Sequence, residues 1–358
     1  MVRSKNQVLK QNNKQTMKII KDNRITIEGY DSSVVEEREP LSEWASSVVE
    51  EDGKSRAEHA WRRFKHNRSA MIGSAIIIMM VVVTILSRPI EVPEMVPLLS
   101  GITVQPFSLA PYPPAVSDYG ATHMPPSLAH PFGTDWTGRD ILSRVMYGAR
   151  FSLSIGFIAV AMMMAIGIPL GSIAGYFGGW IDEIVMRVVD ILYAFPFLVL
   201  AIAVVAIVGR GFWNLVFALV IVGWISYARL IRGEILSVKE KEYVTAAKAL
   251  GGTSQLIIVR HVIPNAVGPV LIYGTLAIGN TVLTAAALGF LGLGLEPVSA
   301  EWGAMLSFGR DTLIQGHWWV TVFPGLAIFA FVMAINLVGD GLRDAFDPQS
   351  ESEGAQLK

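Results

Sequence analysis

Residues 242–264 read EYVTAAKALGGTSQLIIVRHVIP, a polar stretch rich in helix-forming residues. It lies between two long apolar segments, residues 212–227 and 266–295, and each of them suits the interior of a lipid bilayer. A polar stretch held between two membrane segments must itself lie outside the bilayer. The sequence therefore predicts an integral membrane protein with an exposed loop that is large enough for another protein to grip.

Local signals divide this loop into two helices. Residues 237–240, SVKE, have the spacing of a capping box, in which a hydroxyl and a carboxylate satisfy the free amides at a helix start. The pair Gly251-Gly252 stops the first helix, because glycine readily adopts the left-handed conformation of a helix end. Thr253 or Ser254 can cap a second short helix, which ends before Pro264. We therefore expect a helix, a sharp corner and a second helix.

One side of the first helix suits a close-packed partner. Positions spaced by three and four residues share a helix face, and on this face stand Tyr243, Ala246, Ala247 and Leu250. The two alanines leave room for another protein to approach the helix backbone. This face is the predicted docking surface.

The alanine pair, Gly251 and Pro264 match the EAA coupling loop of ABC importer membrane subunits, and residues 242–264 resemble that loop. In that family the loop docks into a cleft on the ATPase subunit. Two positions depart from the family pattern: Thr245 stands where the family usually has Glu, and His261 stands where many members have Ile. The pair Arg260-His261 nevertheless resembles the Arg-His that the peptide and nickel subfamily often has before its proline. The resemblance assigns the ATPase-coupling loop to Glu242, Tyr243, Thr245, Ala246, Ala247, Leu250, Gly251, His261 and Pro264.

Composition places the chain in a bilayer. Of its 358 residues 52% are hydrophobic and only 16% are charged, whereas a soluble domain carries about a quarter charged residues. The formal net charge of −1 gives no reason to expect a nucleic-acid partner, and the absence of cysteine excludes disulfides, thiolate nucleophiles and cysteine-based zinc sites. The first apolar run begins near Ala70, too far along for a cleaved signal, and predicts an uncleaved membrane anchor.

Six stretches are long and apolar enough, some with help from flanking residues, to cross a bilayer core of roughly 20 residues. They are about 70–86, 151–174, 190–208, 212–227, 266–293 and 318–338. These spans divide the chain into five regions. Residues 1–56 are a polar, mostly disordered cytoplasmic extension, and residues 57–87 hold a basic helix and the first span. Residues 88–149 are an extracytoplasmic loop with a short amphipathic helix, residues 150–342 are a core of five spans with the coupling loop at 237–264, and residues 343–358 are a cytoplasmic tail.

Positive charge predicts the orientation. Lysine and arginine gather before the first span and in the coupling region, whereas the turn at 209–211 has only Arg210 and the loop at 296–317 only Arg310. Because cytoplasmic loops carry the excess of basic residues, both termini and the coupling loop are expected in the cytoplasm of a multi-pass plasma-membrane protein.

Residues 130–144, HPFGTDWTGRDILSR, form a second signature. Thr137 and Asp140 repeat the capping-box spacing and predict the start of an amphipathic helix on the outer membrane face. A metal or catalytic site would use His123, His130 and Asp135. These three residues do not provide three ligands close together at helical spacing, so such a site is disfavoured. The segment resembles the one before the second span of dipeptide, oligopeptide and nickel permeases, through His130, Gly133, Asp135, Gly138, Arg139 and Asp140.

Through the end of the second predicted span and beyond it, glycines recur every fourth residue at Gly167, Gly171, Gly175 and Gly179, a pattern that serves either a mobile contact or static packing. Pro196 can kink the third span, and Asn280 and Asn336 can bond between helices or line a passage. The spans hold almost no titratable side chain away from their ends, which argues against a proton-coupled carrier. The chain then has no energy source of its own and must be driven from elsewhere.

The resemblance extends over about residues 57–348 and implies an all-α, six-span permease subunit with the type I ABC importer fold and a cytoplasmic coupling helix. It implies a second homologous permease in a heterodimer, two cytoplasmic ATP-binding subunits that hydrolyse ATP, and an extracytoplasmic solute-binding protein, with no catalytic, cofactor or metal residue in this chain. Two alternatives are a carrier or channel that works without an ATPase, and a scaffold that acts through its N-terminal extension. The sequence leaves open the solute (peptide, nickel or sugar), the residues of its path and the role of the repeated SSVVEE.

Overall fold

The chain divides into two units, residues 1–59 and 60–358, which we describe separately. The computed structural model describes residues 18–19, 25–26, 56–87, 90–91, 103–105, 108–296 and 299–346. In the first unit β1 (Lys18–Ile19) pairs antiparallel with β2 (Ile25–Thr26), and α3 (Arg56–His66) begins. Most of the predicted disordered extension, most of the stretch 88–107 and residues 347–358 of the predicted tail lie outside the described residues.

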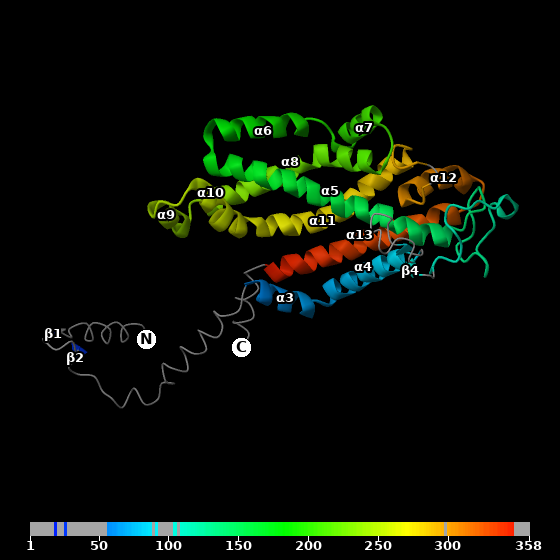
Figure 1. Cartoon of the computed structure of the whole chain (residues 1–358), viewed down its shortest axis with the longest axis horizontal. Coiled ribbons are helices and arrows are strands. Elements are labelled where there is room, and N and C mark those ends of the chain that lie inside the picture. Colours follow the sequence, from blue (N-terminus) through cyan, green and yellow to red (C-terminus); the bar gives the residue numbers. More distant parts are fainter. Residues whose placement is uncertain are drawn as a thin grey trace, which may run out of the picture. The chain divides into compact units, whose positions relative to one another are not determined.

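The second unit is built from helices, apart from a short β3–β4 pair (Ile90–Glu91 and Thr103–Gln105) (Figure 1). This confirms the predicted all-α architecture. In chain order the helices are α4 (Arg68–Leu86), the 3-10 turn η2 (Tyr119–Ala121), α5 (Ile141–Phe177), α6 (Gly179–Tyr193), α7 (Phe197–Val208), α8 (Phe212–Val238), α9 (Glu242–Ala249), α10 (Ser254–Ile257), the π-helix η3 (Ile258–Val262), α11 (Ile263–Phe290), α12 (Trp302–Ile314) and α13 (Trp319–Phe346).

Five helical segments of the described chain are long and apolar enough to cross a membrane: α4, α5, α8, α13 and the continuous run 254–290 that contains α10 and α11. The predicted third span, residues 190–208, is not one straight helix but is bent at Pro196, the residue at which the sequence predicted a kink. Pro196 has no N–H with which to continue α6, and it instead caps α7, so the two helices meet at an angle of 89°. Counted as one broken span, α6 and α7 supply the sixth crossing.

The glycine stripe of α5 sets the closest helix contact of the bundle. A side chain at Gly167, Gly171 or Gly175 would meet the α8 backbone, at the carbonyl oxygens of Trp224, Ala228 and Arg232 respectively. These glycines therefore serve packing, because only a residue without a side chain lets the two backbones approach so closely. Gly179 is not part of the contact: it begins α6 with φ +57° and has open space around it.

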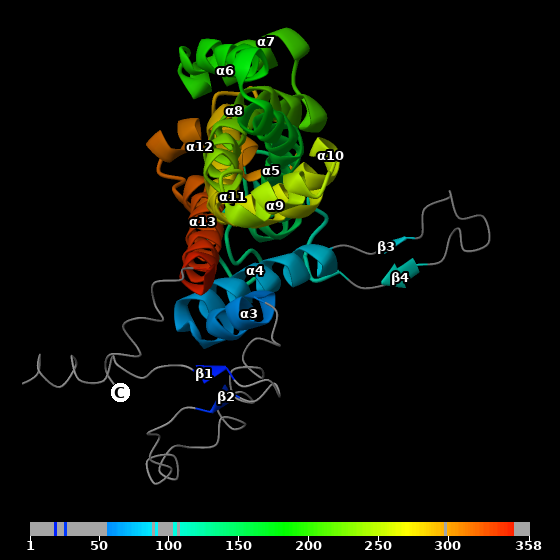
Figure 2. The ribbon, with the colours of Figure 1, turned by 90° about the vertical axis from the view of Figure 1, so that its left-hand side faces the viewer.

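The helices form layers around the α5–α8 pair. Viewed along the bundle from the α9 end, α6 and α7 lie on one side of the pair, and α13 and α4 lie on the opposite side (Figure 2). The buried core runs through α5, α8, α11, α12 and α13, and includes Leu219, Ile231, Val270 and Phe331. The helix α12 was not predicted, because the sequence analysis predicts a loop at residues 296–317.

Candidate functional site

The corner of the coupling loop has the predicted geometry. Gly251 has φ +81°, its N–H donates to the Lys248 carbonyl at 3.0 Å, and the N–H of Gly252 donates to the Ala247 carbonyl at 3.0 Å. This pair of bonds is the Schellman motif, which closes the carbonyl end of a helix. The prediction that the glycine pair ends the first helix is confirmed.

The predicted start of that helix is wrong. Ser237 lies inside α8, which continues to Val238, and α9 begins at Glu242 after Lys241 without a side-chain cap. The buried apolar stripe of α8 continues through Ile235 and Val238, so packing extends the helix past the polar SVKE sequence. The apolar packing of α8 therefore decides where the helix ends, and the capping-box sequence does not start a new helix there.

The second arm also differs from its prediction. Thr253 caps α10, as expected, through a 3.4 Å bond from the N–H of Leu256 to its hydroxyl oxygen. The helix does not end before Pro264 but passes through η3 into α11. In the π turn the Ile263 N–H donates to the Ile258 carbonyl, and the side-chain amide of Asn265 donates to the His261 carbonyl at 2.7 Å. These bonds accommodate the proline without breaking the helix.

The arms of the loop have one buried face and one exposed apolar face. Val244, Ile257 and Val262 are buried in the core, which fixes the loop to the bundle. We call the exposed side chains Tyr243, Ala246, Leu250, Leu256 and Val259 the coupling surface; Leu250 is 89% exposed. Of the other residues assigned here, Glu242 and Thr245 are exposed, whereas Ala247 and His261 are half-buried.

The coupling surface lies at one end of the bundle, and α12 lies at the other (Figure 1). The signature residues 130–144 belong to the α12 end. There the Asp135 carboxylate accepts hydrogen bonds from Arg139 Nε at 2.7 Å and from the Thr137 hydroxyl at 2.8 Å, and it lies 3.7 Å from Arg144 Nε. Gly138, with φ +76°, packs against the Asp118 carbonyl, where a side chain would clash.

Asp140, not Thr137, caps α5. One carboxylate oxygen of Asp140 accepts bonds from the Ser143 N–H and hydroxyl, both at 2.7 Å, and the other lies 3.0 Å from His130 Nδ1. The separate amphipathic helix expected before the second span is also wrong, since α5 runs unbroken from Ile141 to Phe177. Within the described part of the chain no three His, Asp or Glu side chains gather as a metal site would need.

Replacing Asp140 by alanine should lower stability by about 1–2 kcal/mol, because an N-cap is lost and His130 and Ser143 lose their partner. Asp140→Asn keeps a capping oxygen and should lower stability by only about a few tenths of a kcal/mol. Thermal unfolding in detergent measures both. Asp118→Ala is the control, because Asp118 caps only the short η2, and a loss as large as that of Asp140→Ala would contradict the capping role.

Glu301 was not singled out from the sequence. Its carboxylate is buried and accepts bonds from the N–H groups of Gly303 at 2.8 Å and Ala304 at 2.7 Å, and from the Ser152 hydroxyl at 3.2 Å. Burial raises the pKa of Glu301, and the three hydrogen bonds oppose that rise. Glu301 thereby caps α12 and joins it to α5.

Two imidazoles stack beside Asp135, whose carbonyl accepts a hydrogen bond from the His123 N–H at 3.0 Å. The rings of His123 and His317 are 4.1 Å apart and nearly parallel, and His123 holds a left-handed backbone with φ +53°. Burial lowers the pKa of His123, the charge of His317 lowers it further, and Asp135 raises it. Protonating either ring adds a charge beside the other.

The lowered pKa of His123 predicts a pH dependence. The unfolded chain takes up this proton near the ordinary value of 6.5, before the folded chain does, so stability is complete above about pH 6.5 and falls below it. His123→Asn, which tolerates the left-handed backbone, should flatten the decline. Melting temperatures between pH 8 and 5 test this, and parallel curves for the two proteins would contradict it.

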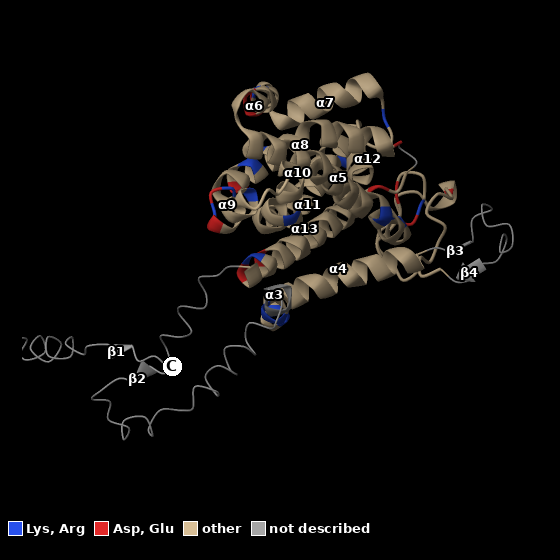
Figure 3. Ribbon diagram, turned by 60° about the vertical axis from the view of Figure 1, so that its left-hand side comes forward, with Lys and Arg blue, Asp and Glu red and all other residues tan. Residues whose placement is uncertain are grey.

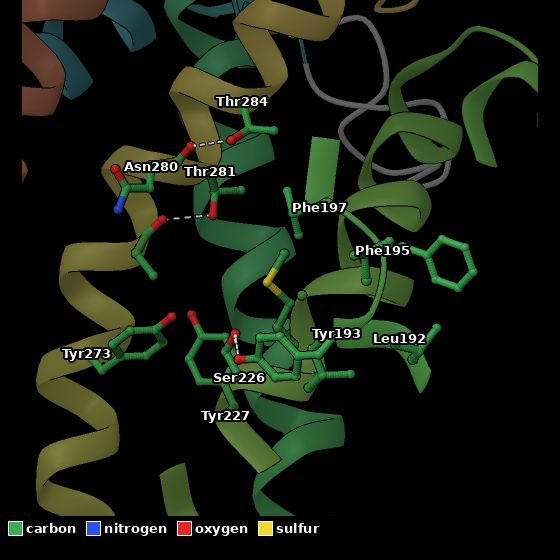
Figure 4. Close-up of a pocket in the computed structure, with 15 residues that line it drawn as sticks. Leu192, Tyr193, Phe195, Phe197, Ser226, Tyr227, Tyr273, Asn280, Thr281 and Thr284 are labelled. Atoms are coloured by element: carbon green, nitrogen blue, oxygen red, sulfur yellow. Dashed lines mark hydrogen bonds between the residues drawn. The ribbon is translucent and has the colours of Figure 1, made fainter. Parts of the chain in front are cut away.

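A pocket of about 400 Å³ opens between α5, α8, α11 and the α6–α7 bend (Figure 4). Its walls combine aromatic rings and methionine with neutral hydrogen-bonding groups, and no lining residue is charged. The lining residues include Tyr193, Phe195, Phe197, Ser226, Tyr227, Tyr273, Asn280, Thr281 and Thr284. Asn280, which the sequence predicted either to bond between helices or to line a passage, lies in this pocket.

Hydroxyl groups and the Asn280 amide supply the polar part of the pocket. Tyr193 of α6 and Ser226 of α8 share a 2.9 Å hydrogen bond, and the buried Tyr227 hydroxyl has no partner among the described residues. The Tyr227 and Tyr273 rings meet edge to face at 5.3 Å. The pocket therefore presents weak, neutral contacts to whatever enters it.

Ion pairs between α6 and α8 hold one wall of the pocket; we call them the α6–α8 clasp. Arg232 donates from two nitrogens to the Asp182 carboxylate at 2.5 and 2.6 Å, and Arg229 donates to Asp190 at 2.5 Å. The Arg229 guanidinium also lies 4.2 Å from the centre of the Tyr193 ring. The clasp thus fixes α6 up to the bend that lines the pocket.

Comparison with known proteins agrees with this architecture. The family model of binding-protein-dependent transport system inner membrane components matches residues 167–351, and that of the N-terminal membrane domain of oligopeptide transport permease C matches residues 55–126. The chain belongs to the family of binding-protein-dependent transport system inner membrane components. Within it, the chain is a permease subunit of an ABC importer, as the sequence predicted, and a multi-pass membrane protein.

Two curated relatives are similar over most of their length. The glutathione transport system permease protein GsiD of Escherichia coli O6:K15:H31 is 42% identical over 81% of this chain and 89% of its own. The dipeptide transport system permease protein DppC of Alkalihalophilus pseudofirmus is 42% identical over 82% of this chain and 90% of its own. Among solved structures, the inward-facing MetNI methionine ABC transporter matches with a TM-score of 0.48 and 20% identity, over 57% of this chain and 97% of that chain.

Proposed function

We propose that this chain forms half of the translocation pathway of an ATP-driven importer for short peptides or a similar small solute. Relatives named for glutathione and dipeptide transport support that class of solute. The pocket supports it as well, because hydroxyl and amide groups suit peptide bonds and aromatic walls suit apolar side chains. The partners are a second, homologous permease in a heterodimer, two cytoplasmic ATP-binding subunits and an extracytoplasmic solute-binding protein.

One observation carries the coupling role. The loop 242–264 is rigid on its inner side, through Val244, Ile257 and the Gly251 corner, yet exposes an apolar patch that includes Leu250. An exposed apolar patch on a rigid element suits a protein partner. This patch would dock on an ATP-binding subunit, which carries out ATP hydrolysis.

The second arm of the loop continues into the helix that lines the pocket. Residues 254–290 are continuous, so a push on α10 moves the pocket side chains Tyr273, Asn280, Thr281 and Thr284 of α11 as part of one rod. The π-helix η3 lies between the surface and the pocket, and such segments often occur where helices adjust. ATP-driven closure of the partner subunits would thus switch the bundle between two states.

The remaining assignments follow from this docking. The α9 end faces the cytoplasm with both termini, and the α12 end, which holds the signature residues His130, Gly133, Asp135, Gly138, Arg139 and Asp140, faces outside. Residues 1–56 form the cytoplasmic extension, 57–87 the first helices, 88–149 the outer loop together with the first turns of α5, 150–342 the core and 343–358 the tail. The buried network around Asp135 and Asp140 supports a structural role for the signature, as a rigid base for the binding protein.

Purification from the native membrane in mild detergent tests the proposal. Mass spectrometry should find two ATP-binding subunits and a second permease with the unchanged chain. Leu250→Glu, which puts a charge on the coupling surface, should lose the ATP-binding subunits and keep the second permease. If the chain purified alone and still moved a labelled dipeptide into liposomes, it would be a carrier and the proposal would fail.

A further inference from the structure

The helix α3 is a short basic helix fixed against the end of α13. Its Ala60 and Phe64 side chains are buried and form a small cluster with Ala70 and Ala345, against which Val338 and Leu342 pack. Asn67, which separates α3 from α4, donates from its side chain to the Asp344 carboxylate at 3.0 Å. One face of the helix is therefore held in place by the second unit itself.

The opposite face is basic. Arg62, Lys65 and Arg68 are exposed, and no acidic side chain of the described chain lies within 4.0 Å of them. Lys65 Nζ lies 5.0 Å above the ring of Trp61, and that ring is 56% exposed. The exposed Trp61, Arg62 and Lys65 of α3 and the exposed Arg68 at the start of α4 thus lie within eight residues of chain, and the three cations have no acidic partner among the described residues; we call these four residues the α3 face.

The length of α4 places the α3 face at the membrane surface. With 19 residues and a rise of about 1.5 Å per residue, α4 is about 28 Å long, close to the roughly 30 Å thickness of a bilayer core. All of α4 is needed for the crossing, so Arg68, its first residue, lies at the edge of the core. Only Asn67 separates α3 from that edge, and α3 turns sharply away from α4 (Figure 3). The helix must then lie among the lipid headgroups.

We propose that the α3 face binds the phosphates of anionic phospholipids. Guanidinium and ammonium groups donate charge-assisted hydrogen bonds to phosphate oxygens, and a tryptophan ring prefers the headgroup layer. The surface of an anionic leaflet attracts basic side chains that lie just outside a membrane span. The acidic stretch 27–52 of this chain is a rival occupant, but the α4 length places the face within the headgroup layer, where lipid phosphates surround it.

Lipid retention by the full chain tests the proposal. The chain is reconstituted in nanodiscs of phosphatidylcholine and phosphatidylglycerol, and native mass spectrometry measures the phosphatidylglycerol that it keeps on release. The variant R62Q/K65Q/R68Q should retain about fivefold less for each charge removed. The matched control R187Q/R210Q/R310Q removes three exposed arginines elsewhere and should retain as much as the unchanged chain.

A second measurement separates binding from folding. In pure phosphatidylcholine the α3 variant should melt at the same temperature as the unchanged chain, and added phosphatidylglycerol should stabilise only the unchanged chain and the control. Equal lipid retention by the variant and the control would overturn the proposal. So would higher retention after deletion of residues 1–52, because the acidic stretch would then be the occupant, and so would loss of an ATP-binding subunit with lipid retention unchanged.

Discussion

Replacing Gly251 by valine should abolish most ATP-driven uptake while the chain still inserts and assembles in the membrane. Gly251 has φ +81°, a conformation that costs an ordinary L-residue about 1–2 kcal/mol and a β-branched residue more. Relief of that strain opens the corner between α9 and α10 and displaces Leu250 from the coupling surface. Since about 1.4 kcal/mol changes an equilibrium tenfold, we expect coupled uptake to fall about tenfold or more.

A conservative variant and a distant variant make this result specific. Gly251→Asn should keep most activity, because asparagine tolerates the left-handed backbone. Gly316→Val introduces similar strain at the α12 end, at φ +89° with open space around it, and should leave coupling to ATP hydrolysis intact. The measurements are uptake and ATP hydrolysis by the assembled complex in liposomes. Normal coupled uptake by Gly251→Val would contradict the docking role of the loop.

Removing Arg232 should have the second largest effect. Its guanidinium makes two charged hydrogen bonds to Asp182, whose side chain is only 18% exposed, so Arg232→Ala leaves a carboxylate that has little water and has lost both of these hydrogen bonds. A hydrogen bond to a charged group contributes about 1.5–3 kcal/mol. We expect α6 to loosen from α8, the pocket wall near Tyr193 to lose its position, and uptake to fall about tenfold.

A double-mutant cycle tests the clasp itself. D182A/R232A leaves no unpaired charge and should recover part of the activity that Arg232→Ala loses, with a coupling energy of about 1–2 kcal/mol. Arg187→Ala is the matched control on α6, because its Glu183 pair is exposed on both sides and should contribute less than about 0.5 kcal/mol. Additive losses in the cycle would show that Asp182 and Arg232 act independently and that no clasp exists.

The sequence was most informative where a single local rule decides the structure. The Gly251 corner, the Thr253 cap and the turn between Gly209 and Gly211 need only backbone geometry that glycine or a hydroxyl supplies. Helix starts at Ser237 and Thr137 were predicted wrongly by the same kind of rule. At Ser237 the buried packing of α8 continues the helix past the predicted cap, and near Thr137 the cap of α5 is Asp140 instead.

The contacts that shape the pocket and the α12 end were beyond sequence reasoning. Arg232 meets Asp182 across fifty residues of chain, and Glu301 meets Ser152 across 149. Nothing local to either residue indicates its partner, because only the crossing of α6 with α8, or of α5 with α12, brings them together. The same holds for Pro264, whose place inside a helix depends on Asn265 and the π turn.

Site-specific crosslinking tests the central claim most directly, because the chain has no cysteine and each introduced thiol is its only one. Leu250 and Ile314 are each 89% exposed, the first at the α9 end and the second on α12. A thiol-reactive crosslinker applied to the assembled complex should join an ATP-binding subunit to Leu250→Cys and none to Ile314→Cys. Capture of an ATP-binding subunit from position 314, or from neither position, would contradict coupling through the α9–α10 loop.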